Sequence, residues 1–430
     1  MRDSLPARTI GFWTAVTIVM GNMIGSGIFL LPASLAPYGA ISLAGWIVSA
    51  GGSILLAVVF ARLARERPAP GGPYVYTKAA FGDLAGFLVA WGYWISVWCT
   101  LAALAVAFVG YLDPFIPTIV RQPASAAILA IAAVWVLTIV NLGGIGSAGR
   151  VQVATTVLKL VPLVIVGFAG LFFLNPAHFA IADASVRSVA HGTTATATLT
   201  LWAFLGLECA TIPAGDIENP HVTIPRATII GTAVTAVIYI ASTVGVMGLI
   251  PPETLGRTSA PFAEAARAMA GNRAAALVAA GAAISCFGAL NGWILVAGQL
   301  PQAVAQDGLF PRMFARTSPR GTPSAALVIG SVLATALIAM NYTRGLVDLF
   351  TFIILLATLS TLVPYAFCSV AGLIDRNVRG HLRPSVVHVL AFAYAVWAIA
   401  GAGADVVYWG FLLLVAGLPV YVVVTTGRSG

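Results

Sequence analysis

The chain has 430 residues, of which 60% are hydrophobic and only 8% are charged. A soluble domain carries about a quarter charged residues, so the composition excludes an ordinary soluble protein. The net charge of +8 does not indicate a nucleic-acid partner, because the positive residues are spread over short loops and form no basic stripe.

Apolar stretches near the ~20 residues that span a bilayer as a helix recur along the whole chain. They are not alternating in polarity, as the strands of a membrane β-barrel would be. The predicted fold is therefore all-α, a polytopic membrane protein with a single transmembrane domain over residues 1–430. Its roughly twelve helices are expected at about 11–36, 40–61, 85–111, 124–142, 150–174, 193–214, 226–250, 275–304, 323–341, 346–373, 385–402 and 405–426.

The first apolar segment is interrupted by GNMIGSG at residues 21–27, and clustered glycines weaken a helix and expose its backbone. The sixth segment has a comparable interruption, WAFLGLE at residues 202–208. Each is followed by a proline, Pro32 and Pro213. Paired broken helices indicate the binding site of a transporter built from inverted repeats. The alternative is that the glycines only permit close helix packing, since Gly21 and Gly25 have the small-xxx-small spacing.

Two charged residues lie deep within predicted helices, where a charge costs at least ~2.5 kcal/mol and usually faces a cavity. Glu208 is the only acidic residue so placed, and Lys159 in the fifth segment is the basic one. Glu208 is interpreted as a functional group, the alternative being a structural carboxylate bonded to the broken helix. Lys159 has a structural alternative too, because Pro162 frees a nearby carbonyl that an ammonium could bind.

Three aromatic residues, Tyr93, Trp202 and Trp293, fall within spans and not at the interfaces where Trp and Tyr concentrate. A cation or an aliphatic chain could stack between them. No metal site, cofactor or catalytic motif is indicated. The four cysteines lack CxxC spacing and are interpreted as packing residues: Cys99, Cys209, Cys286 and Cys368.

Most positive residues fall in cytoplasmic loops if the N-terminus is cytoplasmic, as the positive-inside rule requires. This predicts a multi-pass protein with both termini in the cytoplasm, whose first segment is retained because it is too long for a signal-peptide core. The outer loops then hold Arg121, Arg187, Arg257, Arg267, Arg273 and Arg344.

Five motifs give the chain a family resemblance: GNMIGSGIFLLP (21–32), GGPYVY (71–76), LWAFLGLE (201–208), ENPHVTIPRA (218–227) and DGLFPRMFAR (307–316). Over nearly its whole length the sequence resembles the amino acid-polyamine-organocation superfamily. Within it, the sequence is similar to the bacterial basic amino acid and polyamine antiporters, such as the arginine/agmatine and putrescine/ornithine exchangers.

The resemblance implies two inverted five-helix repeats, about 11–174 and 193–373, with discontinuous helices 1 and 6, plus two C-terminal helices at about 385–426. It implies a location in the bacterial inner membrane among lipids, a small amino acid or amine as substrate, and no nucleic acid; it leaves a homodimer open. Tyr74, Trp202 and Trp293 would act as gates, and Glu208 would sense protons or pair with a substrate amine. The implied substrate-binding residues are Asn22, Met23, Gly25, Ser26, Gly27, Tyr93, Trp202, Ala203, Leu205, Trp293 and Ala357.

The sequence departs from the arginine exchangers at Leu101, Ala203 and Ala357, which are apolar where those proteins have polar side chains. A guanidinium would lose partners there, so ornithine, lysine, a diamine or a smaller amino acid is expected to fit better. Lys159 resembles a lysine that takes the place of sodium in L-type and cationic amino acid transporters, so sodium dependence is not expected.

The predicted function is secondary transport of amino acids or polyamines, expected to be cationic, by sodium-independent antiport or proton coupling. The alternative is a facilitator or exchanger of neutral amino acids. A channel should show rings of like side chains along a pore, and a membrane-embedded enzyme should show paired acid and base groups. Neither pattern occurs in the sequence.

Overall fold

The computed structural model describes residues 11–69, 71–143, 163–181, 183–211, 214, 217–318, 322–343, 346–374 and 382–426. Lys159, Pro162 and Pro213 lie outside these residues. Helices dominate the described part: α1 (Phe12–Met23), α2 (Ser26–Leu35), α3 (Ile41–Glu66), α4 (Pro73–Phe81), α5 (Asp83–Gly110), α6 (Pro117–Val120), α7 (Pro123–Leu142), α9 (Val186–Leu201), α10 (Pro220–Leu249), α11 (Pro252–Leu255), α12 (Pro261–Gln306), α13 (Arg312–Ala315), α14 (Ser324–Asn341), α15 (Leu346–Ile374), α16 (Leu382–Gly401), α17 (Ala404–Val415) and α18 (Gly417–Thr426).

The number of membrane-crossing helices agrees with the sequence prediction. Among the described residues, nine helical spans are long and apolar enough to cross a bilayer, and two shorter apolar helices lie at Leu163–Phe173 and Ser385–Gly401. Together with α9, these occupy the places of the roughly twelve predicted segments. The all-α polytopic fold is thereby confirmed, whereas the division into two inverted repeats stays a prediction.

The structure departs from the predicted boundaries at residues 251–274, which were expected to lie between two spans but contain α11 and the beginning of α12. α12 extends for 46 residues and is kinked at Ala270 and Gly271, whose backbone is not helical. Gly271 has φ of 79°, a conformation that a residue without Cβ adopts at little cost. The last predicted segment is likewise two helices, α17 and α18, which meet at Ala416.

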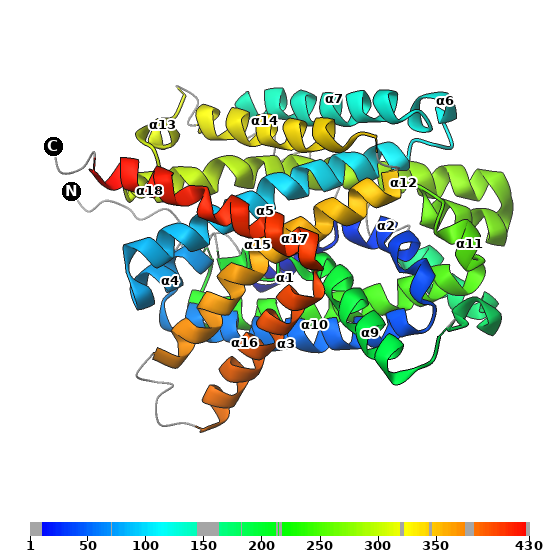
Figure 1. Ribbon diagram of the computed structural model, residues 1–430, viewed down its shortest axis with the longest axis horizontal. Helices are drawn as coiled ribbons and strands as arrows, with labels where there is room; N and C mark the ends of the chain where they lie inside the picture. The colour runs from blue at the N-terminus through cyan, green and yellow to red at the C-terminus, as the bar shows by residue number, and fades with distance from the viewer. Residues whose placement is uncertain are drawn as a thin grey trace.

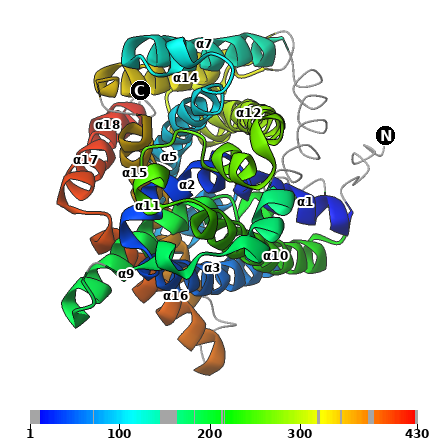
Figure 2. The same ribbon diagram turned by 90° about the vertical axis from the view of Figure 1, so that its right-hand side faces the viewer.

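α5 lies at the centre of the helical bundle. The most apolar part of α5 is 94% buried, and α15, α12 and α7 all pack against this helix. α7 and α14 run side by side along one edge of the molecule, and α16 lies at the opposite edge (Figures 1 and 2). α17 and α18 are peripheral, with only 17% of their apolar window buried. A side chain on α5 can therefore contact several helices at once.

Both predicted helix interruptions are present. α1 ends at Met23 and α2 begins at Ser26, with Ile24 and Gly25 outside helical geometry. The carbonyl of Met23 accepts hydrogen bonds from the Gly25 N–H at 2.9 Å and from the Tyr239 hydroxyl of α10 at 2.6 Å. Membrane interiors tolerate such irregular backbone only where the freed groups are bonded again or line a cavity.

The second interruption follows α9, which ends at Leu201 and continues as the 3-10 turn η4 (Trp202–Phe204). The chain then passes through Gly206, whose φ of 104° strongly favours glycine. A second 3-10 turn, η5 (Cys209–Thr211), follows. Glu208 lies between the two turns, so the break itself positions this carboxylate.

Candidate functional site

The two helix breaks lie against each other. A Cβ atom added at Gly206 would come within 3.2 Å of the backbone carbon and the Cβ of Asn22. A Cβ at Gly27 would collide with the indole ring of Trp202. Glycine is therefore required at both positions for close approach, and the sequence brings the first and sixth segments together through residues that have no side chain.

A small cavity lies between the breaks and has a volume of about 20 Å³. Space of this size holds about one water molecule, whereas small-molecule sites usually offer about 300 Å³ or more. The structure is thus a closed form in which helices must move before a ligand can enter. The cavity is lined by Asn22, Met23, Gly25, Gly27, Thr100, Leu104, Trp202, Leu205 and Trp293.

Most of the residues predicted from sequence to bind a ligand line this cavity, but some do not. Ala203, Ala357 and Tyr93 are buried but do not line the cavity, and the Tyr93 hydroxyl binds Glu208. Ser26 contributes the first residue of α2. Sequence reasoning missed Thr100 and Leu104, both on α5. Thr100 is a polar residue inside an apolar span, which is the signal that could have identified it.

The N-terminus of α2 supplies hydrogen-bond donors beside the cavity. The first backbone N–H groups of a helix have no partner within it, and at α2 these belong to Ser26, Gly27 and Ile28. The indole N–H of Trp202 is also buried and has no hydrogen-bond partner among the described residues. Helix N-termini favour anionic groups, so this side of the cavity is suited to a carboxylate.

Glu208 is fully buried and bonded to two tyrosines. The Tyr93 hydroxyl of α5 donates to Oε1 at 2.5 Å, and the Tyr365 hydroxyl of α15 donates to Oε2 at 2.5 Å. The carboxylate thereby ties the second break to both central helices. Sequence reasoning missed Tyr365, although it also lies inside an apolar span, as Tyr93 does.

The third predicted gate, Tyr74, does not line the cavity between the breaks. It lies on α4, and its hydroxyl donates to Asp307 Oδ2 at 2.6 Å. Lys78 Nζ donates to the same carboxylate oxygen at 3.0 Å and to the Tyr74 hydroxyl at 3.1 Å. Because Asp307 directly follows α12, these contacts tie α4 to the end of α12. Lys159, proposed as a sodium substitute, is outside the described residues.

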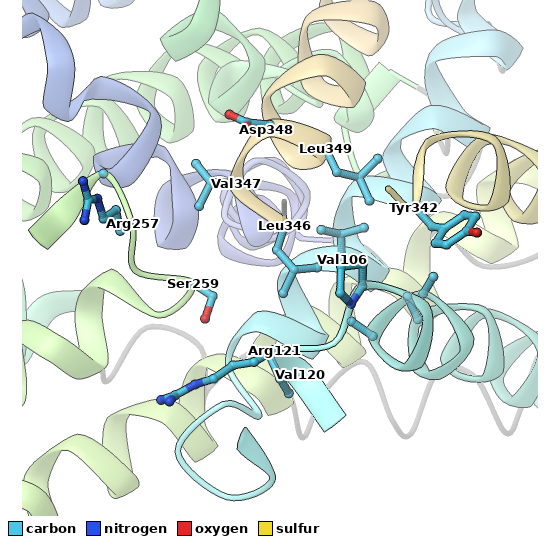
Figure 3. A pocket seen from close by; sticks show the side chains of 15 residues that line it. Val106, Val120, Arg121, Arg257, Ser259, Tyr342, Leu346, Val347, Asp348 and Leu349 are labelled. Carbon is cyan, nitrogen blue, oxygen red and sulfur yellow. The ribbon is translucent and has the colours of Figure 1, made fainter. Parts of the chain in front are cut away.

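A larger hollow, of about 350 Å³, lies at the ends of α5, α7 and α15 (Figure 3). Val106, Val120 and Leu346 contribute to its apolar lining, and Arg121 and Arg257 are its basic residues. None of the residues predicted from sequence to form a site lines it. We take the smaller cavity as the candidate functional site, because among the described residues it is the cavity lined by both helix breaks. In the described part of the chain, no three His, Cys, Asp or Glu side chains are grouped as metal ligands.

Residues 10–427 match the model of a family described as amino acid permease. The chain is 36% identical over 408 residues to the cadaverine/lysine antiporter of Escherichia coli (strain K12), covering 92% of this chain and 90% of that protein. It is 32% identical to a putative arginine/ornithine antiporter of Bacillus subtilis (strain 168), with 96% of each chain covered. It is 30% identical to the putrescine transporter PotE of Escherichia coli (strain K12), again over 96% of each chain.

Proposed function

The chain belongs to the amino acid permease family, and we propose that it exchanges cationic amino acids or polyamines across the bacterial inner membrane. The family and the matched relatives are transporters, so the protein is a transporter and not an enzyme. The names of the relatives support a cationic substrate. The observation that carries the proposal is the buried Glu208 carboxylate at a break in the helix, beside a cavity formed by two such breaks.

A substrate carboxylate would bind at the N-terminus of α2, where the first backbone N–H groups of the helix, those of Ser26, Gly27 and Ile28, have no partner within it. The rings of Trp202 and Trp293 would enclose the aliphatic part of the substrate, since both line the cavity and are about 95% buried. Because the cavity now holds about 20 Å³, binding must accompany a widening of the space between the breaks.

Glu208 would couple substrate binding to helix movement. Two hydroxyl donors hold the carboxylate between α5 and α15. A proton or a substrate ammonium that reaches Glu208 would compete with Tyr93 and Tyr365 for its oxygens, and the break would then be free to move relative to the central helices. Tyr74, Lys78 and Asp307 would form a second closure that ties α4 to the end of α12, and breaking these contacts would release α4.

Counterflow in proteoliposomes tests the proposed function directly. We expect uptake of radiolabelled lysine, ornithine, cadaverine or putrescine only when a cationic substrate is present inside the vesicles. Rates should be equal in sodium and choline buffers, because we propose that the Lys159 ammonium takes the place of a sodium ion. Counterflow by neutral amino acids alone would instead support the neutral exchanger, and a requirement for sodium would contradict the role of Lys159.

The arginine distribution supports cytoplasmic N- and C-termini, with the loop around Arg267 on the outer side. We expect a fluorescent protein fused after Gly430 to fold and fluoresce, and alkaline phosphatase fused there to be inactive. Phosphatase inserted near Arg267 should be active, because that enzyme needs the oxidising periplasm to form its disulfides. An active phosphatase at Gly430 would reverse the assigned orientation.

A further inference from the structure

Thr100 lies on the one face of α5 that contacts both helix breaks. At one end of that face, seven positions before Thr100, Tyr93 binds Glu208 of the second break. At its other end, Leu104 lies 3.4 Å from where a Cβ of Gly25, in the first break, would be. Thr100 lines the cavity between these contacts and is 5% exposed. Its side chain is therefore placed between the α2 N-terminus and the buried carboxylate.

The hydroxyl group of Thr100 can only accept further hydrogen bonds. Its proton is donated to the Ser96 carbonyl at 2.7 Å, and the Ser96 hydroxyl in turn donates to the Tyr93 carbonyl at 2.7 Å. A hydroxyl has one donor and two acceptor sites. With the donor committed to its own helix, Thr100 offers the cavity lone pairs alone, and these suit a ligand that brings hydrogen atoms.

The remaining lining residues provide few other acceptors. Asn22 and Thr100 are the only ones among the nine whose side chains carry an oxygen atom. Leu101 and Ala357, at the positions where the arginine exchangers have polar side chains, are apolar and fully buried. An ammonium has three donors on a compact head, whereas a guanidinium has five in a wide planar fork. Burying unpaired donors is costly, so this cavity can satisfy an ammonium far better than a guanidinium.

We propose that Thr100 accepts a hydrogen bond from the terminal ammonium of the substrate and so selects primary amines, such as lysine or a linear diamine, over guanidinium compounds. This inference rests on the proposed exchange of cationic substrates and names the amine class and the residue that selects it. Thr100 thus supplies a polar contact to the substrate, which the apolar side chains at positions 101 and 357 do not offer.

Substituting Thr100→Val removes the hydroxyl and keeps the shape of the side chain. We expect the affinity for lysine, measured by competition in counterflow, to fall about tenfold to hundredfold, which is the range for losing a hydrogen bond to a charged group. Norleucine, which is lysine without the side-chain ammonium, should bind the variant with an affinity within about twofold of its affinity for the wild type. Cadaverine and pentylamine allow the same comparison without a carboxylate, because they differ only in one terminal ammonium. Thr100→Ser should retain lysine affinity.

Thr358→Val is the matched control, because Thr358 is fully buried, donates to the Ile354 carbonyl at 2.7 Å and does not line the cavity. It should leave lysine affinity unchanged. The inference fails if Thr100→Val keeps wild-type affinity for lysine and cadaverine, if norleucine loses affinity equally, or if wild-type protein binds arginine as tightly as lysine. Failure of wild-type protein to exchange any cationic substrate would instead defeat the proposed function itself.

Discussion

Replacing Glu208 by glutamine should reduce cationic exchange at least tenfold and leave the remaining rate independent of pH. Glutamine keeps the size of the side chain but cannot take up a proton or bear a charge. Of the acidic residues in the described ranges, only Glu208 is buried, so no other carboxyl group is placed to couple protonation to the helix break. Rates of lysine or cadaverine counterflow between about pH 5 and pH 8 give the measurement.

The matched control for Glu208→Gln is Glu264→Gln. Glu264 is partly exposed and pairs with Arg267 at 2.6 Å in the first part of α12, and exposed pairs of this kind contribute little to stability. This variant should keep the wild-type rate and pH profile. Tyr365→Phe removes one donor to the carboxylate and should also alter the profile. If Glu208→Gln exchanges substrate with wild-type rate, selectivity and pH dependence, Glu208 is a structural carboxylate only.

Replacing Gly27 by alanine should weaken substrate binding about fivefold to hundredfold, a range set by the ~1–3 kcal/mol cost of inserting atoms into a packed interior. The added methyl group would overlap the Trp202 ring, which is 5% exposed and packs edge-on against Phe350 at 5.4 Å. Relief requires the indole to turn or the two breaks to separate, and either change alters the cavity. Binding of labelled lysine or cadaverine to purified protein measures the effect.

Gly51→Ala provides the comparison, since a Cβ at Gly51 on α3 would meet no atom within 4 Å. Alanine is favoured over glycine within a helix, so this variant should fold and bind as wild type. Both proteins should be monodisperse, which separates a binding defect from unfolding. Wild-type affinity in Gly27→Ala would show that Trp202 does not close over the site, and the substrate position proposed here would then be wrong.

The sequence by itself determined the membrane class, the approximate number of helices and the two breaks. These features are local: ~20 apolar residues suffice to span a bilayer, and GNMIGSG or LGLE interrupts a helix wherever its neighbours lie. The deep position of Glu208 also followed from the sequence, because the cost of a charge within an apolar segment is independent of the partner it finds.

Only the tertiary structure decided which faces of the helices meet. Tyr93 and Tyr365 lie 115 and 157 positions from Glu208, and no local pattern pairs them with its two oxygens. The same holds for Thr100, which is one of several polar residues on α5 until the packing of α2 against that helix and the meeting of the two breaks place it in the cavity lining. The position of Tyr74 depends on tertiary packing in the same way, because α4 packs near the end of α12 and the Tyr74 hydroxyl binds Asp307 there. Side-chain partners are set by contacts between distant segments, and these depend on how all the helices pack together.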